Sequence, residues 1–330
     1  MRPTAIELFA GAGGFALGME EAGIDVVMLN ELDKWACETL RLNRPKWNVV
    51  EKDISDIDWK GIKADIVAGG FPCQPFSYAG KRLGFEDTRG TMFFEFARCV
   101  KEVKPKMFIA ENVSGLTTHD KGATLKAIVS VMASLGYKVQ YQVLNAYNYG
   151  VPQKRRRIFI VGTLKNLEFR FPAPSSRIIT LSEALKGVPS SSGISYSKGR
   201  SEIMKLVPQG GSWVDLPKEL QLKYMGKSFY SEGGKRGAAR RLSWDEPAPT
   251  LTTSPSQKLT EFCHPDETRP LTVREYARIQ TFPDEWKFAG GVGAQYKQIG
   301  NAAPVALSRA IGIAAARVLS GKLHNVILNR

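Results

Sequence analysis

A glycine-rich turn close to the N-terminus constrains the fold of this chain more than any other feature. The apolar run at residues 4–9 predicts a strand, and residues 15–22 predict a helix with Gly23 at its C-terminal cap. The three glycines of residues 10–14 (AGAGG) lie between them. A strand, a glycine turn and a helix begin a nucleotide-binding βαβ unit, in which N–H groups at the helix start face a ligand. The spacing F-x-G-x-G-G differs from the dinucleotide pattern G-x-G-x-x-G, so the turn alone does not identify the ligand.

The alternation of apolar runs and helical patterns continues over the first half of the chain. Further strands are predicted at residues 25–29, 48–50, 64–68, 106–110, 137–145 and 158–162, and helices at 33–43, 91–103 and 122–135. This order predicts an α/β fold with a mainly parallel sheet and helices on both faces. Because such sheets bind ligands beyond the carboxyl ends of their strands, residues that follow a strand are candidates for a site.

Acidic residues follow the second and third predicted strands. Glu31 lies 18 residues after Gly13, at a position where a carboxylate accepts hydrogen bonds from ribose hydroxyls. A solvated glutamate at the start of a loop is the alternative, and the preceding glycine turn favours the ligand role. Asp53 and Ile54 follow the third strand, where a carboxylate can meet an adenine amino group.

A turn rich in glycine and proline at residues 69–77 (GGFPCQPFS) places Cys73 just past the fourth strand. A lone cysteine in such a turn is more often structural than nucleophilic, because reactivity requires a stabilised thiolate. Glu111 ends the fifth strand at the same edge of the sheet. Cys73 and Glu111 are therefore predicted to face one pocket.

A run of basic residues precedes the strand at 158–162. In an extended segment alternate side chains point the same way, so Arg155 and Arg157 share one face and Arg156 takes the other. Two guanidinium groups aimed into a pocket can bind phosphate, or hold carboxylates and carbonyls in place. A plain nucleic-acid patch on the surface is the alternative.

The net charge points to the class of partner. The chain carries 46 Lys and Arg against 32 Asp and Glu, a formal net charge of +14. A basic chain of this size indicates a polyanion such as nucleic acid. On charge alone, a solvated cationic surface weighs about equally.

The sequence gives little support for a metal site, a disulfide framework, a membrane span or a signal peptide. Four cysteines lie far apart and three histidines show no ligand spacing, so neither a metal site nor a disulfide framework is expected. No run approaches the roughly 20 apolar residues of a membrane span. Residues 1–4 lead directly into a strand, so no signal peptide is expected, and a reduced cytoplasmic setting fits best.

The composition changes after about residue 170. Residues 195–258 contain 11 Lys and Arg against six Asp and Glu, with no strong helical pattern, which is typical of a small irregular domain that contacts phosphates. A long unfolded insertion is the alternative, but aromatic residues such as Trp213, Phe229 and Trp244 supply material for a core. Helical periodicity returns at residues 271–280, and a final helix is predicted at about 304–319 that packs back onto the N-terminal sheet.

Motifs spread over most of the chain resemble, in content and order, those of the bacterial DNA (cytosine-5)-methyltransferases of restriction–modification systems. The matching segments are Phe9-x-Gly11-x-Gly13-Gly14, Glu31, Asp53-Ile54, Pro72-Cys73-Gln74, Glu111-Asn112-Val113, Gln153-x-Arg155-x-Arg157, Arg269 to Glu275, and Gly300-Asn301. The resemblance implies a Rossmann-like sheet that binds S-adenosyl-L-methionine, with a smaller target-recognition domain. It implies a discontinuous catalytic domain at residues 1–170 and 295–330, a recognition domain at 171–268, and a hinge at 269–294.

The resemblance also implies a role for each motif. The cofactor would be bound by Phe9, Gly11, Gly13, Gly14, Glu31, Asp53, Ile54 and Asn301. The thiolate of Cys73 would add to cytosine C6 so that C5 can attack the methyl group, which divides one difficult step into two. Glu111 would bind N3 and the amino group of the base, while Arg155 would support its carbonyl and, with Arg157, hold the pocket.

The implied substrate is double-stranded DNA whose target base is flipped out of the helix. The loop after Cys73 would close on the DNA through Gln74, Ser77, Lys81, Arg82 and Arg89. The residues expected to read or position the DNA elsewhere are Gln153, Arg240, Arg241, Thr250, Leu251, Gln257 and Lys258. A cognate restriction endonuclease would be a separate chain, and the enzyme is expected to act as a monomer.

One departure and two alternatives accompany this interpretation. Leu32 stands where some relatives carry an aromatic residue against adenine, which affects cofactor affinity rather than identity. A tRNA cytosine-5-methyltransferase would carry a Cys-Phe-Thr signature, and the nearest segment here, Phe262-Cys263-His264, differs. A DNA-binding homologue without activity would be expected to lose Cys73, Glu111 or Arg155, all of which are present.

Overall fold

The computed structural model describes residues 1–72, 92–230, 238–257 and 260–321. Its main element is a seven-stranded sheet with the order β3-β2-β1-β4-β5-β8-β6. The strands are β1 (Thr4–Leu8), β2 (Asp25–Glu31), β3 (Val49–Glu51), β4 (Ile66–Gly69), β5 (Met107–Val113), β6 (Lys138–Asn145) and β8 (Arg156–Thr163). Strands β1 to β5 are parallel, and β8 runs antiparallel to β5 and β6. The predicted α/β sheet is confirmed.

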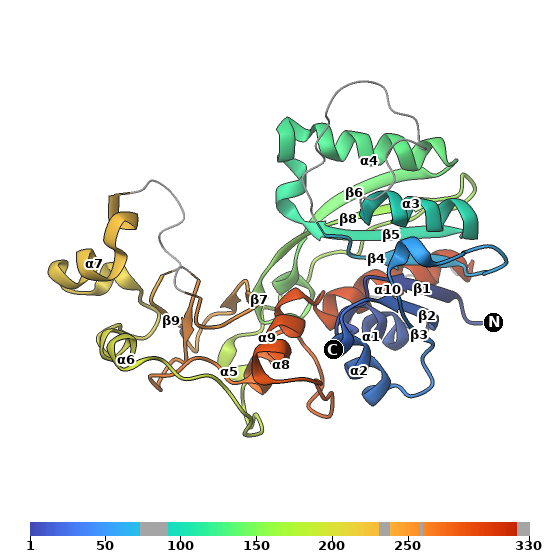
Figure 1. Cartoon of the computed structure of the whole chain (residues 1–330). Helices are drawn as coiled ribbons and strands as arrows, with labels where there is room; N and C mark the ends of the chain where they lie inside the picture. Colours follow the sequence, from blue (N-terminus) through green and yellow to red (C-terminus); the bar gives the residue numbers. More distant parts are fainter. Residues whose placement is uncertain (73–91, 231–237, 258–259, 322–330) are drawn as a thin grey trace.

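Helices cover both faces of this sheet (Figure 1). Helices α1 (Gly14–Glu21), α2 (Lys34–Asn43) and α10 (Val305–Leu319) contribute to one core, and α3 (Met92–Val103) and α4 (Ala123–Ser134) to the other. The first four residues of β5 are all apolar because both faces of the strand are covered: Met107 and Ile109 lie in the first core, Phe108 and Ala110 in the second.

The final helix packs back onto the N-terminal sheet, as predicted, in one core with Ala5 of β1 and Leu29 of β2. Leu307 and Ile311 of α10 share a core with Phe15 and Met19 of α1. The stretch Val292–Leu319 is long and apolar enough to cross a membrane by length and composition alone. It consists of two helices, α9 (Val292–Asn301) and α10, and half of its most apolar window is buried within the protein. We therefore interpret both as core helices.

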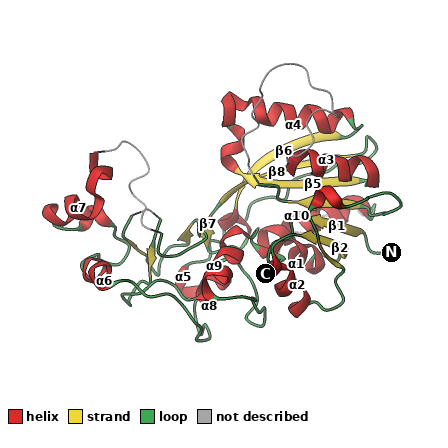
Figure 2. Cartoon of the chain, in the orientation of Figure 1, coloured by secondary structure: helices red, strands yellow, loops and turns green. Residues whose placement is uncertain are grey.

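The second lobe is built mainly from residues 181–263 (Figure 2). It contains α5 (Leu181–Ala184), α6 (Lys198–Lys205), α7 (Lys218–Met225), and the two-residue strands β9 (Arg240–Arg241), β10 (Ala248–Pro249) and β11 (Phe262–Cys263). Strand β10 pairs with β7 (Gln153–Lys154), and β11 pairs with β9. Short 3-10 turns occur at η1 (Ile54–Asp56), η2 (Ser114–Thr117), η3 (His119–Gly122), η4 (Ala146–Tyr149), η5 (Trp213–Asp215) and η6 (Gly226–Tyr230).

The small lobe has its own core, which argues against an unfolded insertion. Met204, Val207, Trp213 and Met225 are buried together there. The expectation that this region lacks helices was wrong, because α6 and α7 each extend over eight residues. Both are short and lysine-rich, so their apolar positions are too few to show a helical period.

A third core joins the two lobes. Helix α8 (Val273–Ile279) and helix α9 pack there with Ala12 and Leu17 from the first lobe and Leu242 from the second. The sequence did not predict α9, which contains two glycines and several polar residues. The segment expected as a hinge therefore contains a packed helix, α8, and the start of α9.

Candidate active site

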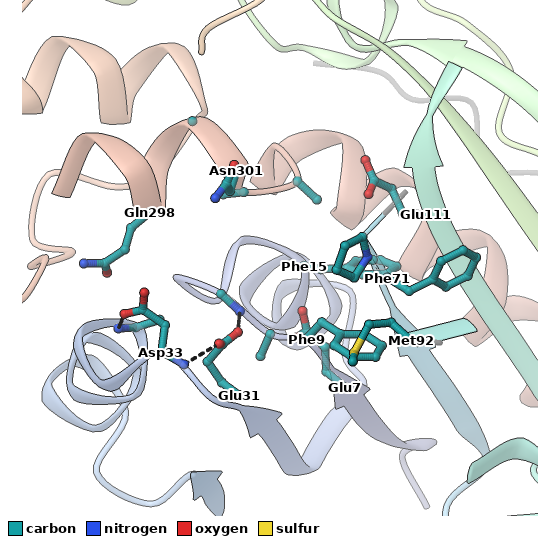
Figure 3. Close-up of a pocket in the computed structure, with 18 of the residues that line it drawn as sticks. Glu7, Phe9, Phe15, Glu31, Asp33, Phe71, Met92, Glu111, Gln298 and Asn301 are labelled. Carbon is teal, nitrogen blue, oxygen red and sulfur yellow. Dashed lines mark hydrogen bonds between the residues drawn. The ribbon is translucent and has the colours of Figure 1, made fainter. Parts of the chain in front are cut away.

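A cavity of about 700 Å³ opens at the carboxyl ends of the parallel strands. It lies where the strand order reverses between β1 and β4, the place where open α/β sheets bind ligands. Residues from β1, β2, β5 and α9 line it, together with the turn that follows β4 (Figure 3). The predicted positions Phe9, Gly11, Glu31, Asp53, Ile54, Glu111, Arg155, Arg157 and Asn301 are all in its wall.

The glycine turn at one end of the cavity has an unusual backbone. Phe9 has φ of 57°, a left-handed conformation that bulky residues rarely adopt, and Gly13 caps α1 with φ of 82°. The carboxylate of Glu31 holds the turn: its Oε2 accepts from the N–H of Gly11 at 2.7 Å, and Oε1 accepts from Leu32 and Asp33. Strain maintained by such bonds is common at ligand sites.

Glu7 is a site residue that the sequence interpretation missed. Its carboxyl lies buried on β1 in the cavity wall, and its Oε2 has no hydrogen-bond partner. Burial raises the pKa of Glu7 well above its usual range, and the negative charge of Glu31 adds to this. The available signal was a carboxylate inside an apolar strand, where a charge is costly unless something pairs with it.

The Asp53–Ile54 turn forms another part of the wall. Asp53 caps η1, and its Oδ1 accepts from the amide and hydroxyl of Ser55 at 2.9 and 2.7 Å. These bonds lower the pKa of Asp53. Asn30 donates to the carbonyls of Val50 and Lys52, so the turn is also fixed from β2. Nearby, Leu32 lines the cavity with 62% of its surface exposed.

The opposite end of the cavity carries the expected acid and an arginine. Glu111 Oε1 lies 2.8 Å from Nε of Arg157, and the two side chains are only 14% and 13% exposed. Burial lowers the pKa of Arg157, and Glu111 opposes that shift. Asn112 donates to the carbonyl of Phe71 at 2.9 Å, which fixes the turn after β4 against β5. Phe71 and Pro72 line the cavity, whereas Cys73 lies outside the described residues.

The three consecutive arginines alternate as predicted, and Arg155 also makes contacts to backbone that the sequence did not predict. Arg155 and Arg157 both line the cavity and Arg156 is exposed. Arg155 donates from Nη1 to the carbonyl of Leu251 at 3.1 Å, and from Nη2 to those of Gly300 at 2.9 Å and Ala302 at 3.3 Å. Burial lowers its pKa to about 9. Its terminal nitrogens therefore hold backbone, while its Nε has no hydrogen-bond partner. Support of a substrate carbonyl by Arg155 stays a prediction.

Three predicted DNA contacts connect the two lobes instead. Gln153 is buried and exchanges hydrogen bonds with Gln280 and with the N–H of Leu251, so the prediction that it touches DNA was wrong. The Leu251 side chain is also buried and cannot read a base. Thr250 donates to the carbonyl of Lys154 at 2.8 Å. These contacts join residues 250 and 251 of the second lobe to the first lobe.

Gly300 belongs to the same junction. A Cβ there would lie 2.1 Å from the carbonyl oxygen of Thr252, so only glycine allows the two backbones to approach. The motif Gly300-Asn301 therefore serves two purposes. Its glycine lets the backbone of residues 252–253 pack closely against α9. Asn301 is exposed in the cavity wall.

Arg241 is a further correction. It is buried and donates to backbone carbonyls, including those of Met204 at 2.6 Å and Val207 at 2.7 Å, so it holds the small lobe together and does not read DNA. Gln257 is exposed and Arg240 is partly exposed. The predicted contacts Gln74, Ser77, Lys81, Arg82, Arg89 and Lys258 lie outside the described residues. Within the described ranges no cluster of His, Cys, Asp and Glu could hold a metal ion.

A family model described as "C-5 cytosine-specific DNA methylase" matches residues 4–316 of the chain. The chain belongs to this family. It is a DNA (cytosine-5-)-methyltransferase, EC 2.1.1.37, and uses S-adenosyl-L-methionine. The tRNA methyltransferase and the inactive DNA-binding homologue are therefore not supported.

Named relatives agree with this assignment. The chain is 58% identical over 323 residues to the type II methyltransferase M.Eco47II of Escherichia coli, covering 94% of this chain and 78% of the relative. It is 56% identical over 320 residues to M.Sau96I of Staphylococcus aureus, covering 94% and 74%.

Solved structures resemble the chain over nearly its whole length. A DNA modification methyltransferase encoded within an E. coli prophage is 25% identical, with a TM-score of 0.71 over 96% of this chain and 99% of that one. A DNMT2 mutant of Spodoptera frugiperda is 16% identical, with a TM-score of 0.68 over 95% and 99%. The second likeness shows the fold alone.

Proposed function

We propose that the cavity binds S-adenosyl-L-methionine with its adenosine at Glu31 and the Asp53–Ile54 turn, and its cationic end toward the glycine turn. The residues fit this group. Glu7 presents a buried oxygen without a partner, which suits a cation, and the turn after β1 presents backbone to the cavity. Both oxygens of Glu31 already accept N–H groups, yet a carboxylate has further lone pairs for ribose hydroxyls. The bound cofactor supplies the methyl group.

We further propose that Cys73, Glu111 and Arg157 act on the cytosine. The Cys73 thiolate adds to C6 as the C5–C6 double bond opens, which makes C5 nucleophilic toward the methyl group. A base then takes the C5 proton, the double bond forms again and the C6–S bond breaks. Arg157 holds Oε1 of Glu111, which leaves Oε2, close to Gly70, to bind N3 and the amino group of the base. Arg157 takes the role of supporting the base carbonyl, and Arg155 positions the pocket.

The observation that carries this proposal is the Glu111–Arg157 pair. The pair lies in the wall of one cavity together with the glycine turn. A largely shielded, charge-paired carboxylate at a strand end is suited to bind a polar base edge, because it is already held in position. The turn that leads to Cys73 reaches the same wall through Phe71 and Pro72.

The two lobes suggest how duplex DNA is held. We infer a catalytic domain at 1–170 and 295–330, a recognition domain at 171–268 and a connection at 269–294, consistent with separate cores on either side of the junction. Sequence reading in the major groove then belongs to the small domain, with Arg240 and Gln257 as remaining candidates among the described residues. The target base must leave the helix to reach the cavity.

The relatives carry the name type II methyltransferase, so we propose a role in restriction–modification. The chain then methylates the site that a separate cognate endonuclease cuts, and thereby protects the host DNA. Such a pair acts in the cytoplasm, where the chromosome lies. We propose that the enzyme works as a monomer.

Methyl transfer from radiolabelled S-adenosyl-L-methionine to mixed-sequence duplex DNA tests the proposal, followed by bisulfite mapping. Wild-type enzyme is expected to label one short sequence, and Cys73→Ser is expected to label none. Label that persists in Cys73→Ser would reject the covalent step. Label spread over unrelated sequences would reject the role in restriction–modification.

A further inference from the structure

Helix α3 carries an arginine that holds the Asp53–Ile54 turn from outside the cavity. Arg98 donates from Nη2 to the carbonyl of Ile54 at 2.8 Å and from Nη1 to the carbonyl of Ile57 at 2.9 Å. Ile54 is the first residue of η1 and Ile57 immediately follows its last. One planar guanidinium therefore joins both ends of the turn.

Neighbouring carboxylates fix the orientation of this guanidinium. Nε of Arg98 donates to Oε2 of Glu95 at 2.8 Å, one helical turn earlier, and Glu102 lies 3.8 Å from Nη1. Glu95 is buried, so its charge requires this partner. Arg98 is thus held by a carboxylate of its own helix, while its two terminal nitrogens bind carbonyls of a different segment. Lysine has a single nitrogen and cannot form this forked contact.

The same helix supports the turn that leads to Cys73. Phe93 and Phe96 of α3 pack against Phe71, with ring centroids 5.5 and 5.8 Å apart. Met92, the first residue of α3, lines the cavity together with Phe71. A rigid element of twelve residues therefore contacts the two turns on either side of the cavity.

We propose that Arg98 is a positioning residue for the cofactor, which sets the Asp53–Ile54 turn relative to the turn preceding Cys73. It does not touch the ligand. It acts through the carbonyls of Ile54 and Ile57, whose placement determines where Asp53 and the Ile54 side chain meet the adenine. The inference rests on the proposed location of the adenine at this turn.

The test compares Arg98→Lys and Arg98→Met with the wild-type full-length enzyme. Binding of S-adenosylhomocysteine and of 5′-methylthioadenosine is measured by calorimetry, and KM is measured for S-adenosylmethionine and for DNA. Both variants are expected to bind both ligands about tenfold more weakly, with an equal increase in the cofactor KM and no change in the DNA KM. Arg98→Lys keeps the charge beside Glu95 and remains informative if Arg98→Met fails to fold.

A matched control and a second variant separate the possible outcomes. Lys126→Ala, an exposed position on α4, should leave all four quantities unchanged. If the Arg98 variants bind 5′-methylthioadenosine normally while Asp53→Ala weakens it, the adenine placement stands and the role of Arg98 is wrong. If Asp53→Ala also binds it normally, the adenine placement itself is wrong. A rise in the DNA KM equal to that of the cofactor would indicate a general structural defect and overturn the inference.

Discussion

Two arginine–glutamate pairs that are largely shielded from solvent, one in each lobe, show what distinguishes a site from a structural contact. In the first lobe Arg157 Nε lies 2.8 Å from Glu111, and in the second Arg200 Nε lies 3.0 Å from Glu261. The distances barely differ, but Glu111 is 14% exposed and Glu261 is 0% exposed. The first pair lines the cavity, whereas Glu261 is fully enclosed, and its Oε1 accepts from the N–H of Ala239.

The surroundings of the second pair explain its role. Arg200 also donates to the carbonyl of Ser256 at 2.7 Å, so it joins α6 to the segment that exposes Gln257. Burial outweighs the attraction of Arg200 and raises the pKa of Glu261 to about 7. An ion pair therefore marks a functional site only where unfilled space adjoins it.

The largest difference between the pairs is expected in catalysis. Glu111→Gln keeps the shape of the side chain and removes its charge, so kcat should fall by about 10²–10⁴-fold. Binding of S-adenosylhomocysteine and the thermal midpoint should change little. Steady-state methylation at saturating substrates measures the first effect. A kcat for Glu111→Gln close to that of Glu261→Gln would remove the distinction drawn here.

The arginine of the first pair should also matter more than its neighbour in the chemical step. Arg157→Lys keeps the charge and loses the planar guanidinium, and kcat should fall by about 10²-fold. Arg155→Lys should instead lower stability, because three backbone carbonyls lose their donor. Parallel measurement of kcat and urea denaturation compares them. The assignment fails if Arg155→Lys is stable and loses kcat as severely.

Replacing Arg241 tests whether this buried arginine stabilises the small lobe. Arg241→Met leaves several buried carbonyls without a donor and should lower the free energy of unfolding by about 2–4 kcal/mol. Gln257→Ala, at an exposed position, should raise the DNA KM and leave stability unchanged. Urea denaturation and DNA titration separate the two. A stable Arg241→Met enzyme with weakened DNA binding would restore Arg241 as a DNA contact.

The pH dependence of stability should report Glu261. Its pKa is raised in the folded state, so the folded protein holds this proton more tightly, and stability is lost as pH rises from about 5 to about 7. This group contributes a fall of up to about 1.4 kcal/mol for each pH unit in that window. Urea denaturation of wild type and Glu261→Gln at several pH values isolates it. Identical slopes would show that Glu261 does not titrate there.

The smallest effect belongs to an exposed pair between the lobes. Lys154 Nζ lies 2.6 Å from Glu246 Oε2, with side chains 49% and 63% exposed. Either Lys154→Gln or Glu246→Gln should change the free energy of unfolding by less than about 1 kcal/mol, because water screens the pair. A loss above 2 kcal/mol in denaturation would show that burial is a poor guide to the importance of charge pairs in this protein.

Much of the first lobe follows from local sequence pattern. Apolar runs predicted its strands to within a few residues, and the helix predicted at 33–43 matches α2, which Asp33 caps. Glu31 and Glu111 were recognised because they follow strands, and strand ends converge at one edge. Helices α6, α7 and α9 were missed because their burial depends on partners distant in the chain, which no local period reveals.

The sequence by itself determined the family and the reaction, and it supplied the candidate residues, since motifs, their order and strand-end positions can be read along the chain. Only the tertiary structure decided which arginine pairs with Glu111, that Arg241 and Gln153 are buried, and that Glu7 lies in the cavity wall with one oxygen unpaired. The physical reason is that an arginine looks the same in sequence whether it meets solvent, a carbonyl or a carboxylate. Its role depends on the groups that folding brings within about 3 Å, which here come from segments up to 147 residues away.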